Sequence, residues 1–202
     1  MPTPAATTKK RDAEAATTKK RDAEATKRRI LDAATAEFAA HGIAGARVDR
    51  IAAAAGANKS LIYAYFGSKD GLFDAVFDAA VTSHIDQVPI DVDDLPGYAT
   101  RLYDHRLAHP ELVRLADWDR LERDGIGANS DVARAAWTHK VKALARAQKE
   151  GKLPTTITAE ALLEFVLAFC QTGLTLAPAT RAATAHRKRI AAGVAQLVEG
   201  DS

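Results

Sequence analysis

A short stretch near residue 60 carries side chains that could contact nucleic acid. Helical spacing puts Ile62 and Phe66 on one side of a short helix, where they must be buried, because positions four apart share a helix face. The opposite side exposes a cation, a hydroxyl, a phenol and a methyl group, contributed by Lys59, Ser60, Tyr63 and Ala64. Such a helix suits the floor of a DNA major groove, where base edges and the thymine methyl are read.

The residues before this helix carry the signals of a preceding helix and a tight turn. Val48, Ile51 and Ala52 share one helix face, and Gly56 can end that helix in a left-handed conformation. Asn58 then stands where an N-cap is needed, because its side chain can accept from the free N–H groups of the next turn. The pattern predicts a helix-turn-helix. On periodicity alone, a plain helical hairpin with packed tyrosines stays open.

Three motifs extend this pattern, together with an upstream segment. They are Val48-Asp49-x-Ile51-Ala52-x-x-Ala55-Gly56, Leu61-Ile62-Tyr63-x-Tyr65-Phe66, Ser68-Lys69-x-x-Leu72 and, upstream, Arg29-Ile30-Leu31-x-Ala33-Ala34-x-x-x-Phe38-x-x-x-Gly42. Together they resemble the tetracycline-repressor (TetR) family of bacterial regulators over roughly residues 26–75. The joint pattern is far more specific than any single glycine motif.

The resemblance implies a set of DNA-contacting residues, with some departures from the family pattern. Arg47 stands where relatives often carry a capping Thr, and we interpret it as a phosphate contact. Ala64 stands where a bulkier aromatic residue or His is common, which leaves a methyl for a thymine methyl. The candidate DNA-binding residues are Arg47, Arg50, Asn58, Lys59, Ser60, Tyr63, Ala64, Tyr65 and Lys69.

The length allows one or two domains, and the composition favours a mostly helical chain. Of the 202 residues 47% are hydrophobic, while glycine (12) and proline (7) are few. With the resemblance, this predicts an all-α fold: an N-terminal three-helix helix-turn-helix DNA-binding domain over residues 26–72 and a C-terminal helical ligand-binding and dimerisation domain over residues 73–202. The single cysteine and the lack of a visible signal or membrane-spanning segment lead us to expect a cytoplasmic protein with no membrane partner.

The first residues form a basic segment. Residues 1–29 hold nine Lys/Arg and four Asp/Glu, whereas the net charge of the whole chain is only +2. Residues 5–14 repeat unchanged as residues 15–24, and the repeat has no apolar side chain larger than alanine. We therefore expect residues 1–25 to be a disordered basic arm. Whether this arm contacts the DNA backbone or is only a solubilising tail stays open.

Helical periodicity and capping signals predict the remaining elements. A first helix from Thr26 carries Ile30, Ala34 and Phe38 on one face and ends at Gly42. Later helices are expected over residues 69–84, 95–108, 110–125, 130–150, 158–177 and 180–199. The acidic segment before residue 97 lacks the spacing of a calcium loop and is interpreted as a linker.

Signals for catalysis are weak. His105, His109, Asp117 and Asp119 are close in sequence, but no glycine elbow surrounds a serine and no Gly-rich loop occurs. Cys170 lies in an apolar helical stretch and is interpreted as a packed thiol. We expect no catalytic residue, no metal site and no cofactor.

The resemblance also implies roles for the second domain. In the TetR family this domain encloses a small molecule, and its last two long helices pair with a second subunit. For this chain the implied homodimer interface is Leu162–Leu174 with Ile190–Val198, including Leu167 and Val194, and Gly173 would permit close helix approach. Six residues are candidate ligand contacts, although each alone is as readily a core residue: Tyr103, His105, Trp118, Trp137, Phe165 and Phe169.

These patterns together predict a homodimeric transcriptional regulator. It would be a repressor that binds a palindromic operator in double-stranded DNA and releases it when a small-molecule effector occupies the body, through a tilt of the helix over residues 69–84. Two alternatives stay open. One is an effector-independent architectural DNA-binding protein, and the other is an all-α small-molecule carrier or enzyme with an incidental basic head.

Overall fold

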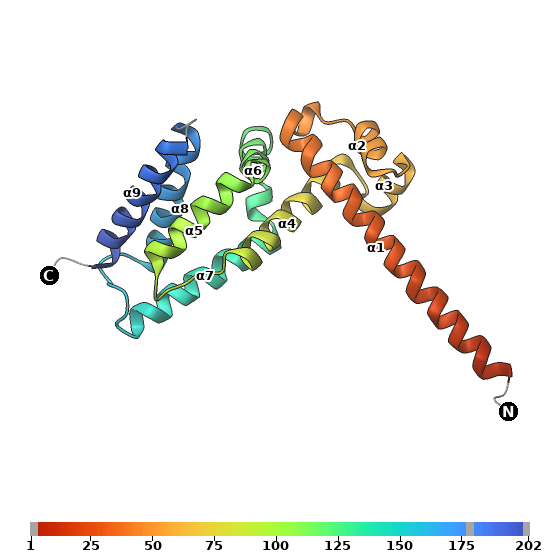
Figure 1. The fold of residues 1–202 in the computed structure, drawn as a ribbon, viewed down its shortest axis with the longest axis horizontal. Helices are drawn as coiled ribbons and strands as arrows, with labels where there is room; N and C mark the ends of the chain where they lie inside the picture. The colour runs from red at the N-terminus through yellow and green to blue at the C-terminus, as the bar shows by residue number, and fades with distance from the viewer. Residues whose placement is uncertain (1–3, 177–179, 200–202) are drawn as a thin grey trace. The chain divides into compact units, whose positions relative to one another are not determined.

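The chain folds into helices grouped in two compact units. The computed structural model describes residues 4–176 and 180–199, with side chains for residues 17–171 and 184–199. Unit 1 ends at Val76 and unit 2 begins at Phe77, slightly later in the chain than the boundary expected at residue 72. No strand occurs in the described ranges, which confirms the all-α fold class (Figure 1).

Unit 1 is built on a long first helix. Helix α1 spans Pro4–Gly45, but Gly42 has non-helical angles (φ 71°), so the regular helix ends where the sequence predicts. Its buried side chains include Ile30 and Phe38, and the Phe38 ring meets Phe73 edge to face with centroids 5.2 Å apart. The arm expected to be disordered is helical from Pro4, because its Ala, Lys, Arg and Glu residues are strong helix formers joined to a packed helix.

Two short helices complete the predicted helix-turn-helix. Helix α2 spans Val48–Ala55, and helix α3 spans Lys59–Phe66. Between them Gly56 takes a left-handed conformation (φ 60°) and its N–H donates to carbonyl oxygens of the last turn of α2. Helix α4, Lys69–Gln87, begins in unit 1 and continues into unit 2.

Unit 2 is a bundle around one apolar core. Its helices are α5 (Leu95–Ala108), α6 (Pro110–Arg123), α7 (Asp131–Lys149), α8 (Ala159–Leu176) and α9 (Thr180–Glu199). Helix α5 packs on both α8 and α9, and α7 packs on α8 (Figure 1). The core holds fully buried residues of these helices, among them Leu102, Leu144, Leu162 and Val194.

Side-chain caps fix the starts of α7 and α8 at the expected residues. The Ser130 hydroxyl accepts from Ala133 N–H (3.1 Å), and Thr158 accepts from Ala161 N–H (3.2 Å). The 3₁₀ helix η1, Gly127–Asn129, was not expected. It forms around the buried Asp119, whose carboxylate accepts from the N–H of Gly127 at 3.0 Å. None of the described helices is long and apolar enough to cross a membrane.

Candidate DNA-contact surface and ligand cavity

Helix α3 presents one uncovered face. Asn58 caps it as the sequence predicts, since its Oδ1 accepts from Leu61 N–H at 2.7 Å. Ile62 is buried (1% exposed) while Phe66 is only half-buried. The side chains of Lys59, Ser60, Tyr63, Ala64 and Tyr65 are all exposed. Two exposed tyrosines on one short helix do not contribute the free energy that burial would give, and their side chains are available to contact a partner.

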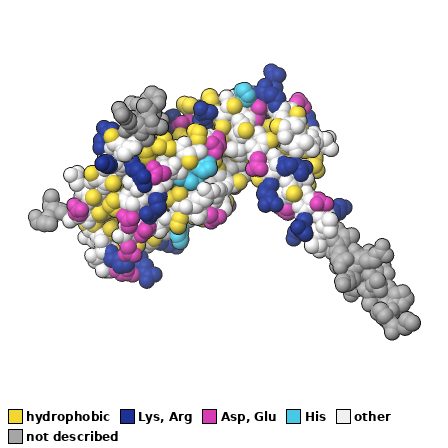
Figure 2. Space-filling model, in the orientation of Figure 1, with side chains coloured by type: hydrophobic (Ala, Val, Ile, Leu, Met, Phe, Trp, Pro, Cys, Tyr) yellow, Lys and Arg dark blue, Asp and Glu magenta, His cyan; other side chains and the backbone are white. Residues whose placement is uncertain are grey.

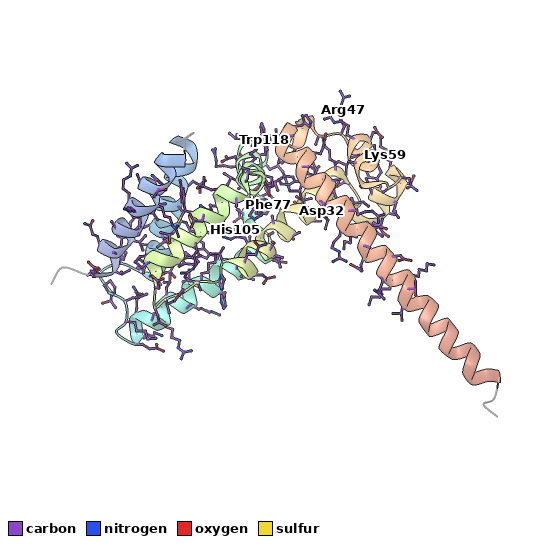
Figure 3. The ribbon with its side chains drawn as sticks, viewed as in Figure 1. Asp32, Arg47, Lys59, Phe77, His105 and Trp118 are labelled. Atoms are coloured by element: carbon purple, nitrogen blue, oxygen red, sulfur yellow. The ribbon has the colours of Figure 1, made fainter. Side chains whose placement is uncertain are left out.

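A carboxylate organises the start of α2 in place of the missing Thr cap. Arg47 has no side-chain capping bond, and its N–H instead donates to Glu37 Oε1 at 2.9 Å. The same oxygen accepts from Arg50 Nε at 2.8 Å. Burial would raise the pKa of Glu37, but these hydrogen bonds outweigh it and lower that pKa. Arg47 is exposed on the surface of unit 1 (Figure 3), whereas Arg50, also exposed, is tied to Glu37.

Two of the candidate lysines already have partners within unit 1. Lys59 forms an exposed ion pair with Asp49 at 3.0 Å, which is worth little in water and can exchange for a phosphate. Lys69 donates to the carbonyl oxygens of Ala44 and Ala46 at 3.2 and 3.4 Å. Lys69 therefore joins α4 to the end of α1. Of the nine candidates, only Lys69 is half-buried, and the other eight are exposed, including Arg50 with its contact to Glu37.

The described part of α1 adds positive charge to unit 1. Figure 2 shows Lys and Arg side chains along this helix, interspersed with acidic ones. Arg29 of this helix stabilises the fold, because its Nε donates to Ala55 O at 3.2 Å and so connects α1 to the end of α2. Lys27 lies over the Phe66 ring, 5.9 Å from the centroid. These cations support a polyanion partner for this unit.

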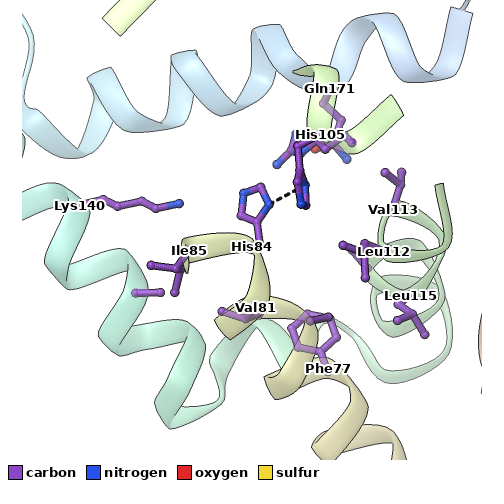
Figure 4. A pocket seen from close by; sticks show the side chains of 14 residues that line it. Phe77, Val81, His84, Ile85, His105, Leu112, Val113, Leu115, Lys140 and Gln171 are labelled. Carbon is purple, nitrogen blue, oxygen red and sulfur yellow. Dashed lines mark hydrogen bonds between the residues drawn. The ribbon is translucent and has the colours of Figure 1, made fainter. Parts of the chain in front are cut away.

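Unit 2 contains a partly open cavity of about 200 Å³. Five helices supply its wall, which is mainly apolar and includes Phe77 and Val81 of α4 and Leu112 and Leu115 of α6 (Figure 4). The polar groups on the wall are His84, His105, Arg106, Lys140 and Gln171. A mainly apolar concave site with a few converging polar groups is typical of a small-molecule site.

Only one of the six candidate ligand contacts belongs to this wall. His105 does, whereas Tyr103 is a core residue (1% exposed) and Trp137 packs on the core. Phe165 is 45% exposed. The Phe169 ring packs closely on Gly193, so that a Cβ added to this glycine would lie 3.2 Å from the ring. Trp118 is half-buried on α6 and is not part of the wall.

The structure shows polar wall residues that sequence reasoning missed. Arg106, Lys140 and His84 come from three helices, and each looks like an ordinary surface residue in the sequence. Periodicity could have found Lys140, which lies four residues before the buried Leu144 and so on the apolar side of its helix.

A hydrogen-bonded histidine pair lies at the edge of the cavity. The Nδ1 atoms of His84 and His105 are 3.2 Å apart, and His105 Nε2 is 3.1 Å from Gln87 Oε1. If His105 donates to Gln87, its Nδ1 accepts from His84, so a neutral pair satisfies every contact. Burial, followed by the charges of Lys140, Arg106 and His105, lowers the pKa of His84 to about 3.

The histidine pair makes the fold sensitive to acid. Between pH 6.5 and about 3 the unfolded chain binds a proton at His84 that the folded chain does not, so stability falls as pH falls. The loss is at most about 1.4 kcal/mol per pH unit, less because the ring keeps some solvent contact. His84→Asn should reduce the difference in melting temperature between pH 7.5 and 4.5, and exposed His139→Asn should not. Equal acid sensitivity in His84→Asn and the wild type would contradict this.

The burial of residues on α8 and α9 shows which side chains are available for the expected dimer interface. Leu162, Ile190 and Val194 point into the core of their own unit, so the expectation that Val194 lies in a seam between subunits is wrong. The exposed side of α8 carries Phe165 instead. Gly193 allows the close approach of Phe169, while Gly173 lies outside the residues whose side chains are described.

Among the described residues, no group of three or more His, Cys, Asp or Glu side chains could hold a metal ion. The Cys170 thiol is buried and donates to Ala99 O at 3.2 Å, as expected of a packed residue.

Comparisons with known proteins agree with this geometry. Residues 30–76 match the family model for bacterial regulatory proteins of the tetR family, and residues 94–199 match the tetracyclin repressor-like C-terminal domain. The HTH-type transcriptional repressor SCO4008 of Streptomyces coelicolor is 45% identical over 141 residues, which cover 69% of this chain and 73% of that protein.

Two further relatives extend the comparison. The HTH-type transcriptional repressor NicS of Pseudomonas putida is 32% identical over 102 residues, covering 46% of this chain and 48% of that protein. The crystal structure of SCO4942 from Streptomyces coelicolor superposes with a TM-score of 0.72 at 35% identity, covering 84% of this chain and 96% of that one. The chain therefore belongs to the TetR family of bacterial regulatory proteins, and it is a DNA-binding transcriptional regulator.

Proposed function

We propose that the protein is a homodimeric repressor that binds a palindromic operator and leaves it when a small molecule fills the cavity of unit 2. The observation that carries this proposal is the pairing of two features in one chain: a capped helix with an uncovered polar and aromatic face, and an apolar cavity lined by the helix that follows it. Two relatives are named as transcriptional repressors, which supports repression rather than activation.

Operator reading is assigned to α3 and its flanks. Lys59, Ser60, Tyr63 and Ala64 supply the groups that can meet base edges, since all four are exposed on one short helix. Arg47, with its side chain free of a capping role, is suited to a phosphate beside the groove. Arg50 and Lys69 act indirectly in this scheme, because their bonds to Glu37 and to the end of α1 fix the position of α2 and α4.

A second copy of the chain is assigned to the outer surface of α8 and α9. One recognition helix offers few base contacts, so useful specificity needs two helices held about 34–36 Å apart. Phe165 on α8 is a large apolar side chain that its own unit leaves 45% exposed, which supports an interface there.

Release is assigned to α4. This single helix begins with residues of unit 1 and supplies Phe77, Val81 and His84 to the cavity wall in its later turns. A ligand that favours one packing of these side chains shifts the preferred position of the helix, and it can do so only by its differential affinity for the two states.

Substitution on α3 tests the assignment of operator reading. Tyr63→Ala and Lys59→Ala should each reduce the free-energy difference between operator and scrambled DNA by about 1–3 kcal/mol, the value of a lost base contact. Helicity and oligomeric state should be unchanged, because both side chains are exposed. Fluorescence anisotropy with both duplexes measures this, with exposed Arg114→Ala in unit 2 as the control. Unchanged discrimination in both variants would remove α3 from the reading surface.

A further inference from the structure

Two cations line the cavity without an opposite charge. Lys140 is only 8% exposed, and its Nζ lies 5.9 Å from the centroid of the Tyr98 ring. Arg106 has a buried Nη1 with no hydrogen-bond partner. Within the described ranges, neither side chain forms an ion pair. Figure 4 shows Lys140 extending from α7 toward the His84 ring.

The neighbouring groups that could carry negative charge are neutral near pH 7. Burial raises the pKa of the Cys170 thiol to about 11 and that of the Tyr98 phenol to about 12. None of the described residues on the cavity wall carries a carboxylate. The carboxylates of Asp78 and Asp119 are used elsewhere, because Asp78 accepts from Ser130 and Asp119 accepts from Gly127.

The positions of these two cations are therefore electrostatically unfavourable without a counter-charge. Burial lowers the pKa of both Lys140 and Arg106, and the charge of Arg106 lowers that of Lys140 further. A buried charge without a partner is costly, and an anion placed between the two would offset that cost. Arginine forms two parallel hydrogen bonds to a carboxylate, while lysine adds a point charge.

We propose that the cavity binds an organic carboxylate, with its charged group between Arg106 and Lys140 and its apolar body against the side chains of α4 and α6. This inference rests on the proposed ligand-controlled function and names the chemical class of its effector. The apolar wall and the volume of about 200 Å³ favour a short- to medium-chain or small aromatic body over a free inorganic anion. The neutral His84–His105 pair lies at the same wall and adds polar groups without adding charge.

A matched ligand series tests the charge preference. Calorimetric titration of the full-length protein without DNA compares hexanoate and octanoate with their primary amides and with the corresponding alkylamines. We expect the better carboxylate to bind roughly 10- to 100-fold more tightly than its amide, as a charge-assisted hydrogen bond predicts, and the amine to bind most weakly. Amides or amines that bind as tightly as the carboxylates, or carboxylates that do not bind, would overturn the inference.

Two cavity variants and one control test whether Lys140 and Arg106 cause the preference for carboxylates. Lys140→Met and Arg106→Met should each lose most of the preference for carboxylate over amide. Lys140→Met without ligand should also melt higher than the wild type, because an uncompensated buried charge is gone. Lys142→Met, exposed on the same helix, should change neither property. A Lys140→Met protein that keeps the full preference would contradict the assignment.

A DNA-release assay separates this inference from the proposed function. If octanoate binds with the expected preference but leaves operator affinity unchanged, the cavity assignment stands and ligand-controlled release fails. If only neutral or cationic molecules bind and release the operator, the function stands and the carboxylate inference fails.

Discussion

Val194→Asp is expected to unfold unit 2. Val194 is fully buried (0% exposed) in the core shared by α5, α8 and α9, beside residues such as Leu162 and Ile190. An aspartate there places a carboxylate among apolar side chains and leaves a cavity. Burying an unpartnered charge costs several kcal/mol, a large part of the 5–15 kcal/mol that stabilises a typical domain.

Urea denaturation followed by circular dichroism measures this effect. Gln196→Asp provides the matched control, since it adds the same charge on the same helix at an exposed position and should change stability by less than about 0.5 kcal/mol. A Val194→Asp protein with the wild-type midpoint would show that Val194 is not a core residue.

Phe165→Asp is expected to give a folded chain that no longer dimerises. The side chain is 45% exposed on α8, so its replacement removes little from the core of its own unit. In the proposed dimer it is an aromatic anchor, and truncating such an anchor costs about 2–4 kcal/mol, or roughly 30- to 1,000-fold in the dissociation constant. Operator binding should fall with dimerisation, because the two recognition helices are no longer held together.

Sedimentation equilibrium and operator binding on the same samples test this prediction. Leu121→Asp is the control, because Leu121 is an exposed apolar residue (62% exposed) on α6, away from α8 and α9. It should leave both properties unchanged. A Phe165→Asp protein that stays folded, dimeric and bound to operator would place the interface elsewhere.

Local signals made much of the fold predictable. Gly56, Asn58, Ser130 and Thr158 mark helix ends by backbone chemistry that needs no tertiary context, and all four act as expected. The helix over residues 95–108 was predicted with its observed bounds, because Pro96 suits its first turn and Pro110 follows its end.

The cavity could not be derived in the same way. Periodicity assigns residues to an apolar face but does not show whether that face meets the core, a cavity or another subunit. Val194 and Phe165 are both apolar residues of the last two helices, yet one is buried in its own unit and the other is exposed. Arg106 and Lys140 line the same cavity because α5 and α7 both pack on α8, which no local signal encodes.

The binding of a specific DNA sequence by a dimer is the central claim, and selection from a random pool of duplexes tests it most directly. The full-length protein is used to enrich duplexes over several rounds, and the affinities of the selected and the starting pools are compared at one salt concentration. We predict an enriched inverted repeat whose half-sites are centred about 10–10.5 base pairs, or a multiple of that, apart. A pool without a common sequence, bound no more tightly than random DNA, would contradict the account.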